Sequence, residues 1–476
     1  MRSRRRGPEP APGGAVVERA SPGRGALSVL LSKELRELAA SRAYWLMLVL
    51  VGLLVGHAFI TAVSAYAEVS GAGGGPAALA QGVSPLDGIL VPTLGAYDLA
   101  AMLLLPFVAI RLVAGEKATG AWKLLLQAPA GRGSLLGAKA LALLLGWVVA
   151  WVPGILALAL WRSYGGHLDA GETLDLVLGH ALRAWLTIGL SAAAAAVAES
   201  AAGAAIVVLG VTLGTWALDF VAAARGGLLQ RLAAYTPSAA LHSFEQGLLR
   251  LGTALVLAAL GAAGVTLAGI WLRTGAPARR RWAETALLAL AAAGVVAAAA
   301  SLRASWDLSE DRRGSFSAAD EAALRRIHAP LRVTVHLAAE DPRLQDLDRG
   351  VLRKLERVLP SLDVRYAAAG RTGLFEADPR YGEVWYELGG RREMSRSTTE
   401  PIVLEVIYGL AGITPPAVQP GGYPGYPLAA RPAGAVPVFF VAWPLLVGLL
   451  FWATRRAPRR RAAGTDAVNA PVEVAS

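Results

Sequence analysis

The chain has 476 residues, of which 55% are hydrophobic and only 17% charged, whereas soluble domains carry about 25% charged residues. This composition, together with 53 glycines, predicts a membrane protein, because glycine is more frequent in spanning helices than in soluble ones. Cysteine is absent, which excludes disulfides and thiolate metal sites. The basic residues behind the net charge of +11 concentrate at 1–42, 111–139, 273–281 and 454–476. Because these segments adjoin apolar runs, the charge indicates membrane topology and no nucleic-acid partner.

The N-terminal residues 1–25 are rich in Arg, Pro and Gly, which predicts a disordered cytosolic tail. A secretory signal peptide is an alternative for the apolar run 43–66, because Ala65-Tyr66-Ala67 resembles a cleavage site. That run is about twice as long as a signal h-region of about 7–15 residues, and it begins far from the terminus. A retained membrane span is therefore favoured.

The segment 26–42 between the tail and the first span predicts an amphipathic helix that lies in the membrane interface. The alternative is a solvated helix that leads into the first span. The apolar face carries leucines at helical spacing and the other face carries charges: Leu27, Leu31, Leu35 and Leu38 against Lys33, Glu34, Arg36 and Glu37.

Eight further runs have about the 20 residues needed to cross the hydrocarbon core. The predicted spans are 43–66, 93–113, 137–160, 176–198, 203–223, 250–272, 283–302 and 436–453. With the N-terminus inside, all four basic segments fall on the cytosolic side, and the outer loop 67–92 contains no Lys or Arg. The positive-inside rule therefore places both termini, including the basic tail 454–476, in the cytosol.

Two outer segments differ from simple loops. Residues 223–249 predict one or two short amphipathic helices, broken at Pro237, that dip into the outer leaflet. Residues 303–414 balance acidic and basic residues and predict a small α/β domain outside the membrane, followed by a proline-rich linker at 415–435. Its expected elements are helix 317–328 capped by Ser315 or Ser317, strand 331–337, helix 342–359, strand 362–366, strand 381–388 and helix 401–411.

The strand–helix–strand order of 331–366 favours a parallel sheet. The fold class is therefore a polytopic α-helical membrane protein of about eight spans, six within 43–273 and two more around a small α/β domain.

Motifs for catalysis are missing. Gly115 and Gly120 have the spacing of P-loop glycines, but Ala121-Trp122 follows instead of Lys-Ser/Thr, so the chain cannot hydrolyse ATP by that route. The six histidines are dispersed without an HExxH pattern or paired carboxylates, so we predict no metal site, no bound cofactor and no enzyme activity. An integral-membrane transferase would require such a cluster.

Four ionisable residues within the predicted spans are candidates for a transport path, because a charge costs about 2.5–3.5 kcal/mol or more at mid-bilayer. They are His57, Asp98, Arg183 and Asp219. One interpretation is that Asp98, Arg183 and Asp219 line a substrate path or pair with one another. The alternative is that they lie near enough to an interface to be hydrated. His57 is more typical of a packing residue.

The segment 111–139 carries a recognisable motif. Its pattern is Glu116-Lys117-x-Thr119-Gly120, Trp122-Lys123-Leu124-Leu125-Leu126, Pro129 and Lys139, in which Gly120 permits a turn before a helix at 122–127. This pattern resembles the loop between the second and third spans of type-2 ABC exporter permeases, and the run Lys33–Glu37 resembles their interfacial helix. The resemblance covers about 26–273. Ala121-Trp122 departs from the family, which often has Thr there.

The resemblance implies an interface with an ABC ATPase subunit, which would hold ATP and Mg²⁺, and assembly as a homodimer or with a related permease. The implied ATPase-coupling residues are Lys33, Glu34, Arg36, Glu116, Lys117, Thr119, Gly120, Trp122 and Leu125.

A second resemblance begins at Ser305. The stretches Ser305-Trp306-Asp307-Leu308-Ser309-Glu310 and Pro330-Leu331-Arg332-Val333 are similar to the start of the extracytoplasmic domain of gliding-motility-type ABC transporter auxiliary proteins. The domain is truncated here, and the resemblance implies a fusion of about 283–435 to the permease. The expected function is an export permease in the bacterial inner membrane. The alternative is a non-transporting envelope assembly or sensing protein that acts through its outer domain.

Overall fold

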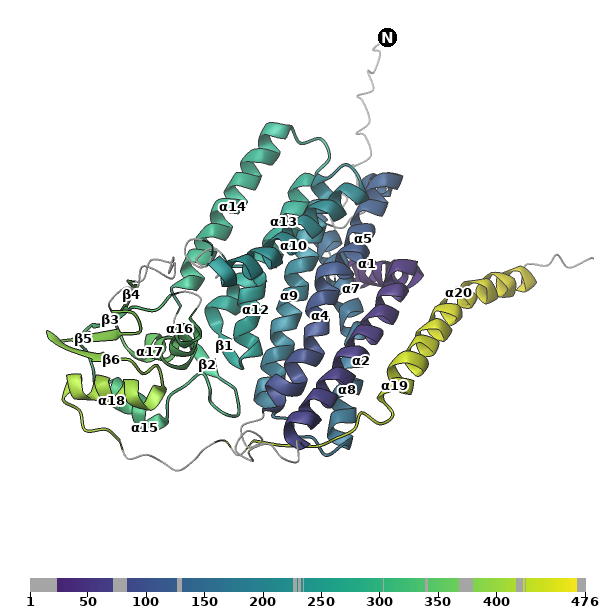
Figure 1. Cartoon of the computed structure of the whole chain (residues 1–476). Helices are drawn as coiled ribbons and strands as arrows, with labels where there is room; N and C mark the ends of the chain where they lie inside the picture. Colours follow the sequence, from purple (N-terminus) through teal and green to yellow (C-terminus); the bar gives the residue numbers. More distant parts are fainter. Residues whose placement is uncertain are drawn as a thin grey trace, which may run out of the picture.

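The computed structural model (Figure 1) contains a helical bundle with a small sheet domain beside it. It describes residues 24–71, 84–125, 131–225, 229, 233, 235–302, 304–338, 341–367, 380–416, 423 and 425–468. The tails 1–23 and 469–476 and residues 72–83 of the predicted outer loop 67–92 lie outside these residues. Eight helical segments in the described part are long and apolar enough to cross a membrane, which confirms a polytopic helical membrane protein.

The eight segments are Arg42–Ser70, Leu86–Thr119, Gly133–Ser163, Ala170–Val197, Ala201–Ala222, Leu251–Trp271, Ala278–Ala300 and Ala435–Arg456. Three of them, the second, the third and the eighth, are interrupted near a proline, which lacks the N–H for the helical ladder. The second consists of η1 (Leu86–Leu90), α4 (Val91–Leu103) and α5 (Leu105–Thr119), and the third of α7 (Arg132–Ala150) and α8 (Val152–Ser163). Each of the predicted spans 93–113 and 137–160 is therefore divided between two helices.

The helix α9 (Ala170–Val197) lies at the centre of the bundle. It packs against α4, α5, α10 (Ala201–Arg225) and most extensively α13 (Leu251–Trp271). A Cβ atom on Gly189 would lie 2.2 Å from the carbonyl oxygen of Gly261, so the backbones of α9 and α13 touch through glycines. α14 (Ala278–Ala300) lies outside α13.

The predicted interfacial helix is α1 (Arg24–Ala40), and one expectation about it is wrong. Glu34 was placed on a polar outer face, but its side chain is fully buried, whereas Leu27 is 43% exposed. Glu34 is buried because α1 packs against α7, and α7 supplies a buried lysine opposite Glu34.

The segment after α10, predicted to lie outside the membrane, contains α12 (Pro237–Glu245), which begins at Pro237, the position of the predicted break. Thr236 caps its N-terminus, and Phe244 packs against Gly179 of α9. The strand β1 (Leu248–Arg250) follows and pairs antiparallel with β2 (Ser305–Asp307). Neither strand was predicted, because three residues are too few for a sequence pattern.

The small α/β domain, called the outer domain because it is predicted to lie outside the membrane, contains a four-stranded sheet in the order β4–β3–β5–β6. The predicted parallel pair is confirmed in β3 (Leu331–Val335) and β4 (Leu362–Tyr366), which are joined through α16 (Pro342–Leu347), η2 (Asp348–Leu352) and α17 (Arg353–Val358). β5 (Val384–Leu388) is antiparallel to β3. β6 (Arg391–Ser395) was not predicted, because an exposed, charged edge strand lacks an apolar alternation.

Two further helices belong to the outer domain, and the second of them packs on β5 and β6. α15 (Ala318–Leu324) is capped by Ser317, the second of the two predicted caps, and α18 (Glu400–Ala411) ends at Gly412. After the linker, α19 (Ala435–Pro437), η3 (Val438–Ala442) and α20 (Trp443–Val468) pack on α2 (Arg42–Gly71).

Asp341 gives the outer domain an expected acid sensitivity. Hydrogen bonds from Arg343 and Tyr381 lower the pKa of Asp341 to about 2, against about 3.9 in an unfolded chain. A lowered pKa stabilises the fold above pH 4, and this stabilisation is lost as the pH falls from about 4 to 2. We expect Asp341→Asn to lower stability at pH 7 by less than about 1 kcal/mol and to flatten the pH dependence in that window, measured by calorimetry of the full chain. An unchanged slope would contradict this assignment.

Candidate functional site

A buried ion-pair network joins three helices at the end of the bundle that carries α1. Lys33 and Glu34 come from α1, Glu116 comes from α5 and Lys139 comes from α7. Lys139 is only 1% exposed, and its Nζ donates to Glu34 Oε2 at 2.8 Å and to the carbonyl oxygen of Leu112 at 3.2 Å. The same Nζ lies 2.8 Å from Glu116 Oε2, an ion-pair contact without hydrogen-bond geometry.

Lys33 closes the network from its solvent side. Its Nζ contacts Glu34 Oε1 at 2.9 Å and Glu37 Oε2 at 3.1 Å, and it also donates to Glu116. Partial burial works to lower the pKa of Lys33, but the hydrogen bonds to Glu116, Glu34 and Glu37 outweigh it, so the pKa is raised above its usual range. Lys33 therefore stays charged.

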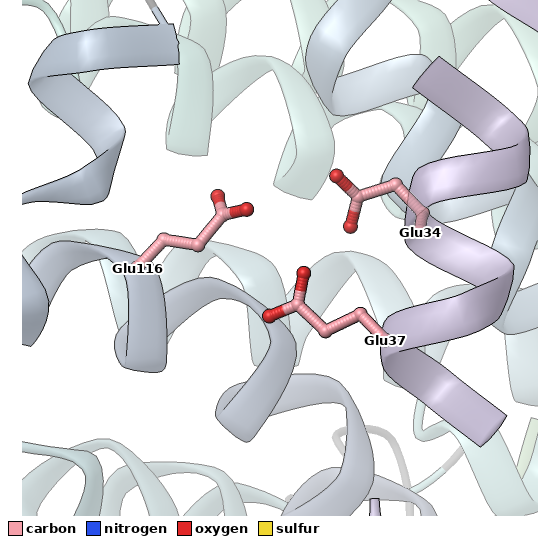
Figure 2. Close-up of side chains that lie close together, drawn as sticks. All are labelled: Glu34, Glu37 and Glu116. Atoms are coloured by element: carbon pink, nitrogen blue, oxygen red, sulfur yellow. The ribbon is translucent and has the colours of Figure 1, made fainter. Parts of the chain in front are cut away.

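The three carboxylates converge closely enough to resemble a metal site, as Figure 2 shows for Glu34, Glu37 and Glu116. The donor set does not fit that role, because ammonium groups already engage these carboxylates from two sides. Lys33 and Lys139 supply the positive charge that a cation would bring. The cluster is a structural joint between helices.

A sharp turn follows the network. Gly120, at φ 74°, ends α5 in the left-handed conformation that favours glycine, which agrees with the predicted turn. Thr119 Oγ1 donates back to the carbonyl oxygen of Gly115 at 3.0 Å. The short helix α6 (Ala121–Leu125) then begins. The predicted helix extended to Gln127, and residues 126–130 lie outside the described part.

Two side chains tie this turn to the ends of distant helices. Lys117 Nζ donates to the carbonyl oxygens of Ala196 and Ala198, at 2.9 Å and 2.7 Å, at the C-terminus of α9. Trp122 is buried, and its Nε1 donates to the carbonyl oxygen of Leu272 at 2.9 Å, just after α13. All three bonds satisfy carbonyls that a helix end leaves unpaired. The segment 116–125 therefore contacts α1, α7, α9 and the end of α13.

The predicted coupling residues divide into buried and exposed groups. Glu34, Glu116 and Trp122 are buried and cannot contact a partner directly in this conformation, whereas Arg36 is exposed. Leu125 is partly buried beside a groove of ≈ 590 Å³ between α1 and α5. Leu124 lines the same groove and is 69% exposed.

Three residues of this site were not among the coupling residues predicted from the sequence. Lys139 had a signal, because it is a lone charge at the start of an apolar run. Lys123 and Leu124 belong to the motif in segment 111–139, but only the structure distinguishes their exposed side chains from the buried side chain of Trp122.

The predicted intramembrane residues do not gather into one path. Arg183 on α9 donates to Asp98 on α4 at 2.8 Å, so these two pair with each other. Asp219 accepts a hydrogen bond from Thr236 at 2.6 Å, and His57 is exposed beside a pocket that Asp87 also lines. His180, which was not singled out, is buried on α9 with neither ring nitrogen hydrogen-bonded among the described residues.

Comparison with known proteins bears on the part of the chain that contains the ion-pair network. Residues 28–244, just under half of the chain, match the family model of the ABC-2 family transporter proteins. The match supports a type-2 ABC permease. No curated protein matches the chain. Permeases of this family are membrane components without an ATPase site and normally pair with an ATPase subunit. The matched residues contain α5, α6, α7 and most of α1, and the match ends within α12, before the outer domain.

Proposed function

We propose that this chain is the permease subunit of an ABC export system and couples ATP hydrolysis on a separate ATPase subunit to substrate movement across a bacterial inner membrane. The partner would bind ATP and Mg²⁺, because this sequence lacks a P-loop lysine. The family match over 28–244 supports the permease assignment. The positive-inside rule supports cytosolic termini and an extracytoplasmic segment 303–435.

The connection of segment 116–125 to several helices carries this proposal. A force applied to exposed Leu124 and Lys123 is transmitted by Trp122 to the end of α13 and by Lys117 to the end of α9. Glu116 passes it to α1 and α7 through Lys33 and Lys139. A rigid, packed joint of this kind moves the spans together, since packed elements shift as bodies and do not deform continuously.

Coupling is tested at the exposed face of α6. Leu124→Ser removes an apolar side chain that is 69% exposed, so the fold should be unaffected. We expect at least a tenfold loss of ATPase stimulation when the variant is reconstituted with the ATPase that co-purifies with the tagged chain. The matched control is Val69→Ser, which removes a 54% exposed apolar side chain near the C-terminal end of α2.

Unchanged stimulation in Leu124→Ser would remove α6 from the coupling surface, and the absence of a co-purifying ATPase would contradict the proposed function itself. Glu116 is unsuitable as a contact probe. Glu116→Arg would place a third cation between Lys33 and Lys139 and would disrupt the network whether or not a partner docks there.

We further propose that two copies, or one copy and a related permease, form the transport path. In this proposal the segment 283–435 is a truncated gliding-motility-type auxiliary domain fused to the permease. The strand beginning at Leu331 and its parallel pairing with β4 support this origin.

A further inference from the structure

The linker after the outer domain is held against the outer end of the bundle, which is the end opposite α1 and α6. Residues 425–434, here called the strap, cross this end before α19 (Figure 1). Tyr66 of α2 donates to the carbonyl oxygen of Tyr426 at 2.6 Å, and Tyr164 donates to that of Ala433 at 2.6 Å. Leu428 and Ala430 pack on the core of the bundle. The sequence predicted an extended linker, not a docked strap.

One three-residue contact joins the strap, the bundle and the outer domain. His167 lies in the loop between α8 and α9, Glu310 lies just after β2, and Tyr426 lies in the strap. His167 Nε2 lies 3.1 Å and 3.0 Å from the two carboxylate oxygens of Glu310. The ring of Tyr426 stacks on His167 at 3.8 Å between centroids and 15° between planes, and its hydroxyl donates to Glu310.

Each of the three partners is positioned by its own segment. Trp161 Nε1 donates to the carbonyl oxygen of His167 at 2.8 Å, which fixes the loop. The backbone N–H of Glu310 donates to Glu172 Oε2 at 3.2 Å, which fixes the start of the outer domain on α9. The hydroxyl bond to Glu310 raises the pKa of Tyr426, so the phenol stays protonated and remains a donor.

We propose that His167, Glu310 and Tyr426 form a latch that holds the outer domain and the strap over the outer ends of α2 and α9, and that this latch opens during transport. The second part rests on the proposed function. Charged groups near the latch in the described part of the chain include Asp169, Glu172, Asp311 and Arg313.

Burial distinguishes the latch from the ion-pair network at the opposite end. The side chains of His167 and Glu310 are 33% and 25% exposed, whereas those of Lys139 and Glu34 are 2% and 0% exposed. Water can replace the hydrogen-bond partners of the latch residues but cannot reach those of the ion-pair network. The latch is therefore the weaker of the two contacts. Movement of the spans therefore separates the latch while the network stays closed.

The strap has a fixed end beyond the latch. Trp443 of α20 fits against Gly52 of α2 and donates to the carbonyl oxygen of Leu48 at 2.8 Å, and Phe439 packs against Gly56. A Cβ on Gly52 would lie 2.0 Å from the Trp443 ring, so this contact is tight. Opening of the latch therefore separates the strap from His167 and Glu310 but leaves the last span in place.

Hydrogen exchange of the purified full chain in nanodiscs tests the latch without any partner. We expect Tyr426→Ala and His167→Ala to raise amide exchange at 425–434 and 308–313 at least tenfold, and Tyr426→Phe to give a smaller rise because it keeps the ring stack. The control is His242→Ala, which removes the His242–Glu245 pair on α12, away from the strap. Equal exchange in Tyr426→Ala and the parent would overturn the latch.

A separate experiment tests whether the latch opens, by cross-linking the latch in its closed state. The natural chain has no cysteine, so His167→Cys combined with Tyr426→Cys can be bridged by a thiol-cleavable bifunctional reagent without background. We expect the bridge to abolish stimulation of the co-purifying ATPase and thiol reduction to restore it, while the unbridged double variant retains stimulation. Full stimulation with the bridge in place would overturn opening during transport. Loss of stimulation in the parent chain would instead contradict the proposed function, and the exchange experiment would still report on the latch.

Discussion

Replacing Lys139 by methionine is expected to lower the free energy of unfolding by about 3–5 kcal/mol, because the change removes one partner of a buried ion pair. Lys139 is 1% exposed and faces Glu34 and Glu116, which are also buried. Methionine keeps the length of the side chain but leaves two carboxylates with one ammonium, Lys33. The cost is mainly that of uncompensated buried charge and not of lost packing volume.

The measurement is equilibrium unfolding of the purified chain in mixed micelles by titration with a denaturing detergent. Lys123→Met is the matched control, because Lys123 is exposed on α6, and its effect should stay within about 0.5 kcal/mol. Adding Glu34→Gln to Lys139→Met should recover part of the loss, since one unpaired charge is removed. If both single variants are equally stable, the network does not hold α1, α5 and α7 together.

Gly189→Val is the second large expected effect, with a loss of about 3 kcal/mol or more, or of folded yield. A Cβ on Gly189 would lie 2.2 Å from the carbonyl oxygen of Gly261, and one on Gly264 would lie 2.4 Å from the carbonyl carbon of Gly189. These neighbours are backbone atoms, which cannot rotate away as a side chain can. The two most closely packed helices, α9 and α13, would have to separate.

The matched control is Gly210→Val on α10, where no atom lies within 4 Å of the added Cβ. It should leave the folded yield and unfolding midpoint close to those of the parent, measured by size-exclusion chromatography and the same detergent titration. A normal yield of Gly189→Val with a reduced yield of Gly210→Val would contradict the packing at the centre of the bundle.

Local patterns were sufficient for several elements of the fold. Apolar runs of spanning length indicated the eight candidate spans, and the alternation in 331–335 and 362–366 indicated the parallel pair of the outer domain. The glycine at position 120 indicated the turn before α6, since a left-handed residue is needed there. Each of these features depends on residues that are close in the sequence.

Contacts across long sequence separations were not accessible in the same way. The helical pattern of 26–42 separated polar from apolar positions, but it could not show that Glu34 faces Lys139, 105 residues away. The pairing of β1 with β2 was missed for the same reason, because each strand has only three residues and gains its partner from another part of the chain.

The sequence by itself determined that this protein is a polytopic membrane protein whose charged segment at 111–139 lies between two spans, because hydrophobic length and charge distribution are local properties of the chain. Only the tertiary structure decided how that segment is held: Glu116 and Trp122 point inward as anchors, while Lys123 and Leu124 remain exposed. The physical reason is that burial of a charge is tolerated only where a distant helix supplies its partner, and Lys139 supplies it here.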